Sequence, residues 1–297
     1  MPMRHLALAA AAAACCVPAT AARAQIRASE RAAVSQTVDG TTFTVDYARP
    51  RVRGRDPLFG SRAVHWGETW TPGANWATTL ELSRAATVGG RKVAKGKYSV
   101  WMVPRASGNW TLVLDPKPDI FHMSPPDSSA AQVRLAVRAE PAPFTEVLTF
   151  EFPEVTTGGT TLAFRWARTR VAVPLQVEPS LAVELPEAEA APYVGRWTYV
   201  KRDTPDEKPV TIEFRTLYEG GTLKAEWLPA DPYMQRFALV RVRPDLFFPG
   251  LYDKDGKIYE VMRPDMAFTF TRVGGRPDSL EVRYSDDFLA GTARRKP

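Results

Sequence analysis

Cysteine and histidine are scarce in this sequence. Of its 297 residues, two are cysteines, Cys15 and Cys16, and three are histidines. Both cysteines lie in a segment that we expect to be removed, so the remaining chain can form no disulfide and must be stabilised by core packing. His65 and His122 lie 57 positions apart, without an HxH or HExxH pattern. The sequence therefore predicts no metal site and no cofactor.

A long apolar run and a strong excess of one charge are also absent. The apolar stretch at residues 6–17 is too short to cross a bilayer, so no transmembrane segment is expected in the mature chain. The 39 basic and 33 acidic residues give a net charge of +6, and loss of Arg4 and Arg23 leaves 37 − 33 = +4. Without a recognisable binding module, this mild excess argues against nucleic acid as a partner. The fractions of hydrophobic (44%) and charged (24%) residues are those of a soluble globular protein.

The motifs of several enzyme classes are missing as well. The sequence contains no GxSxG elbow, no SxxK pair, no Walker loop and no GxGxxG that opens a helix. Aspartate and glutamate are plentiful, so an envelope hydrolase that uses an unmarked carboxylate pair, with His65 as a helper, stays open. We rank binding above catalysis and predict no catalytic residues.

The first 24 residues have the pattern of a signal peptide. Arg4 precedes the apolar stretch at 6–17, and Ala22-Arg23-Ala24 is a small-x-small cleavage site that leaves Gln25 as the new N-terminus. The chain is therefore predicted to be exported, to the periplasm or beyond the cell. A minority alternative is a lipid anchor on Cys15, although Ala12 is a poor match to the bulky residue expected three positions earlier.

Short runs of β-branched and aromatic residues recur every eight to twelve positions between residues 33 and 177. About nine strands are expected, among them 33–38 and 41–47 around the Asp39-Gly40 turn, and separate strands at 161–166 and 171–177. No segment shows a helical apolar period. This pattern predicts an antiparallel β-sandwich over residues 25–177.

The composition changes at residues 178–192, which are rich in proline, alanine and acidic residues and are expected to form a linker with a turn of helix. Eight further short strands are expected between 195 and 284, joined by tight turns. We therefore predict a small β-barrel over residues 193–297. The fold class is all-β, with a sandwich followed by a barrel.

Four arginines alternate in the sequence at Arg49, Arg51, Arg53 and Arg55. In an extended strand they would share one face, where an anion, carboxylates or aromatic rings must neutralise them. One interpretation is a binding site for anions or acidic glycans, in which Arg49, Arg53 and Arg55 hold anionic groups. The other, which we favour, is a loop held by internal salt bridges.

Tryptophans and polar residues follow directly after the arginines. Trp66, Trp70 and Trp76 accompany His65 and Asn75 within a short stretch, a combination that suits stacking on a sugar or another flat ligand. Trp70 and Asn75 are the candidates to stack and to hydrogen-bond, and His65 is a further candidate ligand residue. Tryptophans in a sandwich more often fill the core. Pro72-Gly73 suggests a type II turn with a positive φ at the glycine.

Residues 30–177 contain a series of ordered motifs: ERAAVSQTVDGTTFTVDYARP (30–50), RGRDPLFG (53–60), W-x-x-GAN-x-ATT (70–79), GGRKVAKGKYSVWMVP (89–104) and NWTLVLD (109–115). In this order they resemble a bacterial family known as domain of unknown function 2911. Two positions depart from the family pattern, Thr71 in place of arginine and Trp76 in place of glutamate, so a site built on those charges would be altered here. The resemblance implies an exported or envelope-associated β-domain without an established activity.

The C-terminal half begins with Tyr193-Val194-Gly195-Arg196-Trp197, which contains a G-x-W pattern. This is the pattern of a first lipocalin strand, and the C-terminal half is similar to small lipocalin-like barrels. The resemblance implies that Gly195 and Trp197 close the barrel together with a terminal arginine, Arg294 or Arg295, and that the barrel has an apolar ligand cavity. A barrel of this size can equally be filled by its own side chains, and we expect a filled one.

Together these patterns predict an exported protein that binds an envelope component, a glycan or a small amphiphile. The candidate ligand sites are the arginine- and tryptophan-rich segment of the sandwich and the mouth of the barrel. The third alternative is a structural interaction module in which both cores are filled. It differs from the binding hypothesis because it has no concave pocket.

Overall fold

The computed structural model describes residues 28–202, 204–232 and 234–297 of the chain. The predicted signal peptide at residues 1–24, including Cys15, lies outside the described residues. Within the described ranges, no helix has the length and apolar character needed to span a membrane. Strand pairs in the sheets are antiparallel and helix is limited to two short turns there, so the all-β prediction is confirmed.

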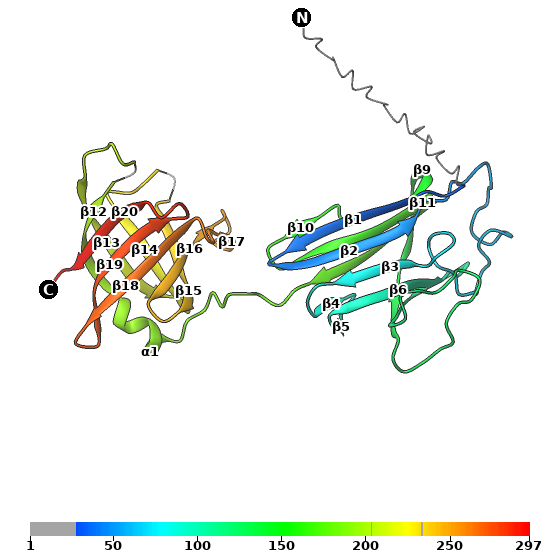
Figure 1. The fold of residues 1–297 in the computed structure, drawn as a ribbon, viewed down its shortest axis with the longest axis horizontal. Helices are drawn as coiled ribbons and strands as arrows, with labels where there is room; N and C mark the ends of the chain where they lie inside the picture. Colours follow the sequence, from blue (N-terminus) through cyan, green and yellow to red (C-terminus); the bar gives the residue numbers. More distant parts are fainter. Residues whose placement is uncertain (1–27, 203, 233) are drawn as a thin grey trace, which may run out of the picture.

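The N-terminal part folds into two antiparallel sheets whose side chains share one core (Figure 1). The first sheet has the order β1 (Arg31–Val38), β2 (Thr41–Ala48), β3 (Thr78–Leu82), β6 (Gly96–Val103), β7 (Trp110–Asp115) and β8 (Val133–Val137). The second sheet contains β10 (Val155–Thr156), β11 (Gly159–Gln176), β4 (Ala86–Val88), β5 (Arg91–Val93), and β9 (Ala139–Glu151) paired with β11. This arrangement is the predicted sandwich.

The first hairpin forms where its turn residues predict it. Asp39 (φ 42°) and Gly40 (φ 73°) both adopt the left-handed conformation that a two-residue hairpin turn requires. In β2, alternate residues Phe43, Val45 and Tyr47 are buried, so period-two alternation directs one face of the strand into the core.

The predicted pair of strands at 161–166 and 171–177 is a single strand, β11, and the prediction of two strands is wrong. Ala167 lies in the left-handed region (φ 51°), and the register with β9 shifts on both sides of it. This irregularity interrupts the apolar alternation without ending the strand, because backbone pairing with β9 resumes at Thr169. The sequence therefore shows two short apolar runs where the backbone is continuous.

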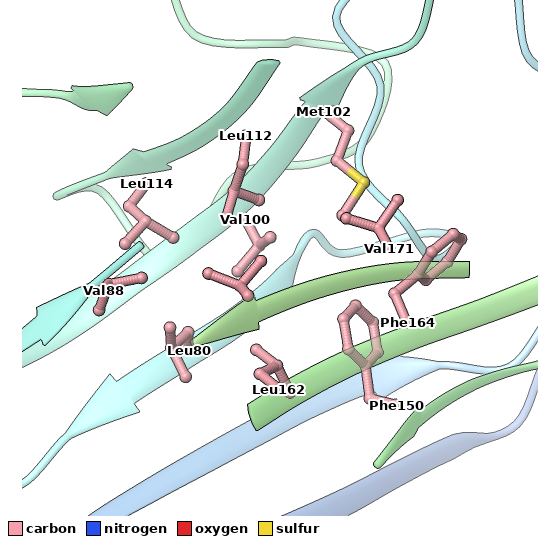
Figure 2. Close-up of a pocket in the computed structure, with 11 residues that line it drawn as sticks. Leu80, Val88, Val100, Met102, Leu112, Leu114, Phe150, Leu162, Phe164 and Val171 are labelled. Carbon is pink, nitrogen blue, oxygen red and sulfur yellow. The ribbon is translucent and has the colours of Figure 1, made fainter. Parts of the chain in front are cut away.

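The sandwich core is densely packed. Figure 2 shows eleven apolar side chains from both sheets pointing into the space between them, among them Leu80, Met102 and Phe164. They leave a void of about 20 Å³, which is about the space of one water molecule, and its apolar lining would keep it dry. The interior of the sandwich therefore offers no room for a ligand.

The C-terminal part is an antiparallel barrel of eight strands, with one further strand paired at its rim (Figure 1). Pairing of β15 with β16 closes it. The strands are β12 (Gly195–Lys201), β13 (Val210–Glu219), β14 (Thr222–Leu228), β15 (Arg236–Arg243), β16 (Leu246–Tyr252), β18 (Met266–Val273), β19 (Arg276–Tyr284) and β20 (Leu289–Arg295), with β17 (Ile258–Val261) beside β16. Strand β20 was not predicted, and it pairs with both β12 and β19.

The end of the segment predicted as a linker packs into the barrel. It forms α1 (Glu187–Ala190) and the 3₁₀ helix η1 (Ala191–Tyr193). Leu185, Ala190 and Tyr193 are buried in the barrel core. These residues cover the end of the barrel at which β12 begins.

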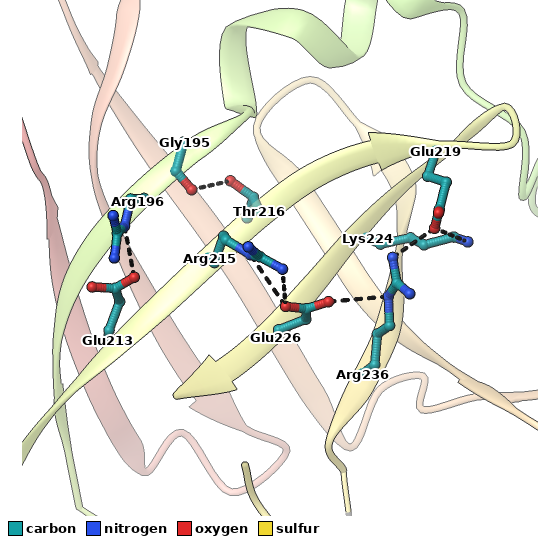
Figure 3. Close-up of polar contacts among 9 residues, drawn as sticks. All are labelled: Gly195, Arg196, Glu213, Arg215, Thr216, Glu219, Lys224, Glu226 and Arg236. Carbon is teal, nitrogen blue, oxygen red and sulfur yellow. Dashed lines mark hydrogen bonds and ion pairs between the residues drawn. The ribbon is translucent and has the colours of Figure 1, made fainter. Parts of the chain in front are cut away.

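The outer surface of the barrel has a chain of ion pairs across β12 to β15 (Figure 3). Arg196 pairs with Glu213, and Arg215 pairs with Glu226 on the next strand. Further pairs join Glu226 to Arg236, and Glu219 to both Lys224 and Arg236. Since opposite charges face each other across neighbouring strands, the network supports the register of the barrel.

Candidate functional site

The barrel contains a cavity of about 580 Å³ at the end opposite to η1. Strand β12 shows which end this is: Gly195 adjoins η1, whereas Tyr199 and Lys201, at the far end of the strand, line the cavity. The barrel is therefore filled by its own side chains near η1, as expected, and hollow at the other end, where the expectation of a filled barrel is wrong.

The cavity wall is mainly apolar and comes from many strands. Its lining residues are Tyr199, Lys201, Trp227, Asp231, Pro232, Met234, Leu251, Met262, Met266, Val282, Tyr284 and Ala290. Apolar walls with a few polar groups at defined positions are typical of sites for small organic molecules, as is a volume within about 300–1,000 Å³.

Four aromatic rings form a layer between the cavity and the closed end of the barrel. Trp227 lines the cavity, and its ring packs against Phe214, Phe237 and Phe268. The centroids of these rings are 4.7 to 6.4 Å apart. Because Phe214, Phe237 and Phe268 are fully buried, this layer is a rigid floor.

An ion pair lies among the polar lining residues. The Lys201 ammonium is 3.1 Å from Asp231 Oδ2, and both side chains are partly exposed. Asp231 Oδ1 also accepts a hydrogen bond from the backbone N–H of Met234 (3.1 Å). The pair places one positive and one negative group on the edge of a mainly apolar cavity.

Three methionines line the same cavity: Met234, Met262 and Met266. Methionine side chains are unbranched and polarisable, so they adapt to ligands of different shapes at low cost. The wall is therefore suited to a flexible apolar ligand rather than to one rigid shape.

At the closed end, Arg295 covers Trp197. The guanidinium carbon lies 4.5 Å from the centroid of the Trp197 ring, and the group donates hydrogen bonds to the carbonyls of Pro192, Val194 and Pro277. A Cβ at Gly195 would lie 2.8 Å from Arg295 Nη1, so glycine leaves room for the guanidinium in this position. This accounts physically for the spacing of Gly195 and Trp197.

Of the two candidate arginines, Arg295 makes this contact and Arg294 does not. Arg294 is exposed and pairs with Asp278 on the outer surface (3.4 Å). Alternation along β20 explains the difference, because neighbouring residues of a strand point to opposite faces. Arg295 therefore replaces Arg294 as the barrel-closing residue.

A second polar cluster fixes η1 at the same end. The Tyr193 hydroxyl donates to Asp245 Oδ1 (2.7 Å) and accepts from Arg272 Nη2 (2.8 Å). Burial of the hydroxyl, followed by its hydrogen bond to Asp245, raises the pKa of Tyr193. These contacts hold the closed end in place, so a ligand could enter only from the other end.

In the sandwich, the four arginines do not share one extended face. Arg53 (φ 52°) and Gly54 (φ 69°) form a turn, with a hydrogen bond from the N–H of Arg55 to the carbonyl of Val52. Arg55 donates to the carbonyls of Val52 and Arg51, and Arg53 donates to the carbonyl of Ala28. The prediction of a common extended face is wrong, because the backbone reverses within the run.

The remaining two arginines contact β9. Arg49 donates to the carbonyl of Leu148 and to the hydroxyl of Thr149, both at 3.3 Å. Arg51 pairs with Glu146 (3.4 Å), and the backbone N–H of Arg53 donates to the same carboxylate (3.2 Å). Main-chain carbonyls therefore hold most of these guanidinium groups, instead of the acidic side chains that the favoured interpretation expected.

Trp70 belongs to an aromatic cluster at the end of the sandwich. Its ring stacks on Trp166 with an interplanar angle of 10° and a centroid distance of 5.8 Å, and Arg55 lies over Trp166 at 5.8 Å. Phe59 and Phe164 pack against Trp70 edge-on. The Trp70 ring therefore already packs against aromatic side chains of the same domain.

His65 and Asn75 are exposed. His65 is 3.5 Å from Glu68. Asn75 adopts the left-handed conformation (φ 63°), and its carbonyl accepts the N–H of His122. The positive φ predicted for Gly73 falls on Asn75 instead. At Gly73 a Cβ would lie 2.8 Å from Thr78 Oγ1, so glycine is needed for close approach.

Sequence reasoning missed the residues that line the cavity of the barrel. Only its general position, the mouth of the barrel, was predicted. In retrospect the methionines are a signal, since Met234, Met262 and Met266 are all the methionines of the barrel sequence and all line the cavity. No group of three or more potential metal ligands occurs in the described residues.

Comparison with known proteins gives one match. A family model described as "Protein of unknown function (DUF2911)" matches residues 29–175. No curated protein and no solved structure matches the chain.

Proposed function

Because residues 29–175 belong to the DUF2911 family, whose description names no function, we propose a function from the barrel: the protein binds a small amphiphile in the barrel cavity. The apolar part of the ligand lies on the aromatic floor. Its polar head lies near Lys201 and Asp231.

The observation that carries this proposal is the cavity of about 580 Å³ with its apolar wall. The cavity is lined by methionine, leucine, valine and tryptophan. Transfer of hydrocarbon from water into such a cavity is favourable by about 0.8 kcal/mol for each buried CH₂. Affinity should therefore increase with the length of an alkyl chain until the cavity is filled.

The ion pair supports an amphiphile over a pure hydrocarbon. A ligand without polar groups would cover the Lys201–Asp231 ion pair and remove its contact with water, which costs free energy even though the two charges are paired. A head group with both donors and acceptors can contact both side chains.

Two alternatives, an anion or glycan site on the arginines and a hydrolase site in the barrel, have less support. An anion or glycan site on the arginines would have to compete with the main-chain carbonyls that Arg49, Arg53 and Arg55 already contact. A hydrolase in the barrel would need two carboxylates, and among the described residues the cavity lining contains one, Asp231.

Fluorescence titration with the apolar probe N-phenyl-1-naphthylamine tests the proposal, followed by displacement with 1-hexanol, 1-octanol, 1-decanol and 1-dodecanol. We expect a saturable signal, and displacement that strengthens with chain length. Ala290→Phe, which projects into the cavity from β20, should abolish the signal. Thr292→Phe, on the exposed face of the same strand, is the matched control and should retain it. Absence of probe binding to the unmodified protein would refute the proposal.

We also propose that the chain is exported, on the pattern of residues 1–24. Expression in a Gram-negative host should yield a periplasmic protein whose mass corresponds to a start at Gln25. A product lipidated at Cys15 would favour the minority alternative, and a cytoplasmic product that retains residues 1–24 would contradict export.

A further inference from the structure

A second hollow lies on the sandwich domain, independent of the barrel cavity. It has a volume of about 340 Å³, and its lining includes Trp76, Asp46, Asp119, Lys97 and Arg31. The strands β1, β2, β3 and β6 supply one side of it, and residues 118–119 of the loop after β7 supply the other.

Two aromatic rings stand exposed at this hollow. The Trp76 side chain lines it and is 56% exposed, and Phe121, beside it, is 41% exposed. Their centroids are 5.7 Å apart and their planes meet at 82°, so the rings form a corner open to solvent. Large aromatic side chains next to each other on a surface commonly mark a binding site.

The corner is held rigidly from below. Trp76 and Phe121 form an antiparallel bridge, and the N–H of Ala77 donates to the carbonyl of Ile120 (2.9 Å). Ala77 packs with the buried Trp101 and Val113 in a small core on this face of the sheet. The exposure of the rings is therefore a property of a fixed structure.

Charged groups of both signs border the aromatic corner. Asp46 accepts a hydrogen bond from Arg31 Nε (2.7 Å). Lys97 and Asp119 are exposed, and neither side chain forms an ion pair or hydrogen bond with another described residue. The site thus offers an unused donor and an unused acceptor next to an apolar surface.

We propose that this hollow is a binding site for a glycan, with a pyranose ring stacked on Trp76. A pyranose has an apolar C–H face and a rim of hydroxyl groups, each of which both donates and accepts. The C–H face matches the aromatic ring, and the hydroxyl groups match Lys97 and Asp119. A hydrocarbon would leave both charges desolvated without partners.

Isothermal titration calorimetry of the full chain with chitohexaose, cellohexaose and maltohexaose tests this site. At least one of them should bind, and Trp76→Ala should weaken binding about tenfold or more, which is a loss of about 1.4 kcal/mol. Lys97→Ala and Asp119→Ala should weaken it severalfold. Phe144→Ala removes another exposed aromatic ring of the same domain and should leave the affinity unchanged.

Three results would overturn the proposal. The first is that none of the three oligosaccharides binds, and the second is that Trp76→Ala binds as tightly as the unmodified protein. The third is a dimer in solution that Trp76→Ala converts to a monomer, because the corner would then be an interface between copies. Probe binding in the barrel should persist in Trp76→Ala, so a failure of one site can be told from a failure of the other.

Discussion

Gly291 illustrates how a single residue shapes the barrel interior. A Cβ at this position would lie 2.3 Å from the Tyr199 hydroxyl and 2.5 Å from the carbonyl oxygen of Val200. Tyr199 lines the cavity and is almost fully buried. The absence of a side chain at 291 therefore allows the tyrosine to take its place in the wall.

Gly291→Ala should destabilise the barrel by about 1–3 kcal/mol, since the added methyl group overlaps both a ring and the backbone. Thermal unfolding followed by circular dichroism measures the effect. Gly158→Ala is the control, because nothing lies within 4 Å of its Cβ and its φ is not positive, and it should change stability little. Equal stability of the two variants would contradict the close approach at Gly291.

The guanidinium of Arg295 should matter more than that of Arg294. Arg295→Ala removes the cation–π contact with Trp197 and three hydrogen bonds to carbonyls, and we expect a loss of about 2–4 kcal/mol. Arg294→Ala removes an exposed pair with Asp278 and should cost less than about 0.5 kcal/mol. Chemical denaturation of both variants compares them, and a larger loss for Arg294→Ala would reverse the assignment.

At the residue scale, the sequence predicts a backbone conformation only where the residue type has a strong local preference for it. The Asp39-Gly40 turn was predicted because its residue pair has a strong local preference. The face shared by the arginines was predicted wrongly, because the positive φ of Arg53 has no comparable signal in the residue type. The G-x-W pattern marked the first strand of the barrel, whereas the choice between Arg294 and Arg295 depended on the register of β20.

At the scale of elements, β20 shows why one strand escaped prediction. Its sequence, LAGTARR, has a glycine and two alanines and only one β-branched residue. These small residues leave room for large side chains of the neighbouring strand, such as Tyr199 of β12. Its position between β12 and β19 is a consequence of barrel closure, and local propensity does not report it.

The ion-pair network on the outside of the barrel should make the stability of the fold sensitive to acid. Hydrogen bonds from Arg196 and then Lys296 lower the pKa of Glu213 from its ordinary 4.5 to about 2. A carboxyl group with a lowered pKa in the folded state stabilises the fold fully above about pH 4.5, and this contribution is lost as the pH falls toward 2.

Between pH 5 and pH 2.5, the barrel of Glu213→Gln should therefore lose less Tm than that of the unmodified protein. The variant has no carboxylate to protonate at this position. Glu178→Gln alters an exposed glutamate outside the barrel strands and is the control. If Glu213→Gln and the unmodified protein lose Tm equally over this range, the network does not stabilise the fold as described.

For the whole molecule, the two parts differ in what their interiors can do. The sandwich core leaves a void of about 20 Å³, whereas the barrel contains about 580 Å³ of space above a packed aromatic layer. Both folds were predicted from strand patterns. The hollow half of the barrel was not, because it depends on how side chains from many strands meet after closure.

Differential scanning calorimetry with and without saturating 1-dodecanol tests the central claim, that the barrel cavity binds an amphiphile. The barrel transition is identified as the one that Arg295→Ala lowers. At a free ligand concentration of about 100 times Kd, binding stabilises the folded state by about 2.7 kcal/mol. We predict a rise of roughly 10 °C in the barrel transition alone, and its absence in Ala290→Phe. A shift of the sandwich transition instead, or no shift of either, would contradict the account.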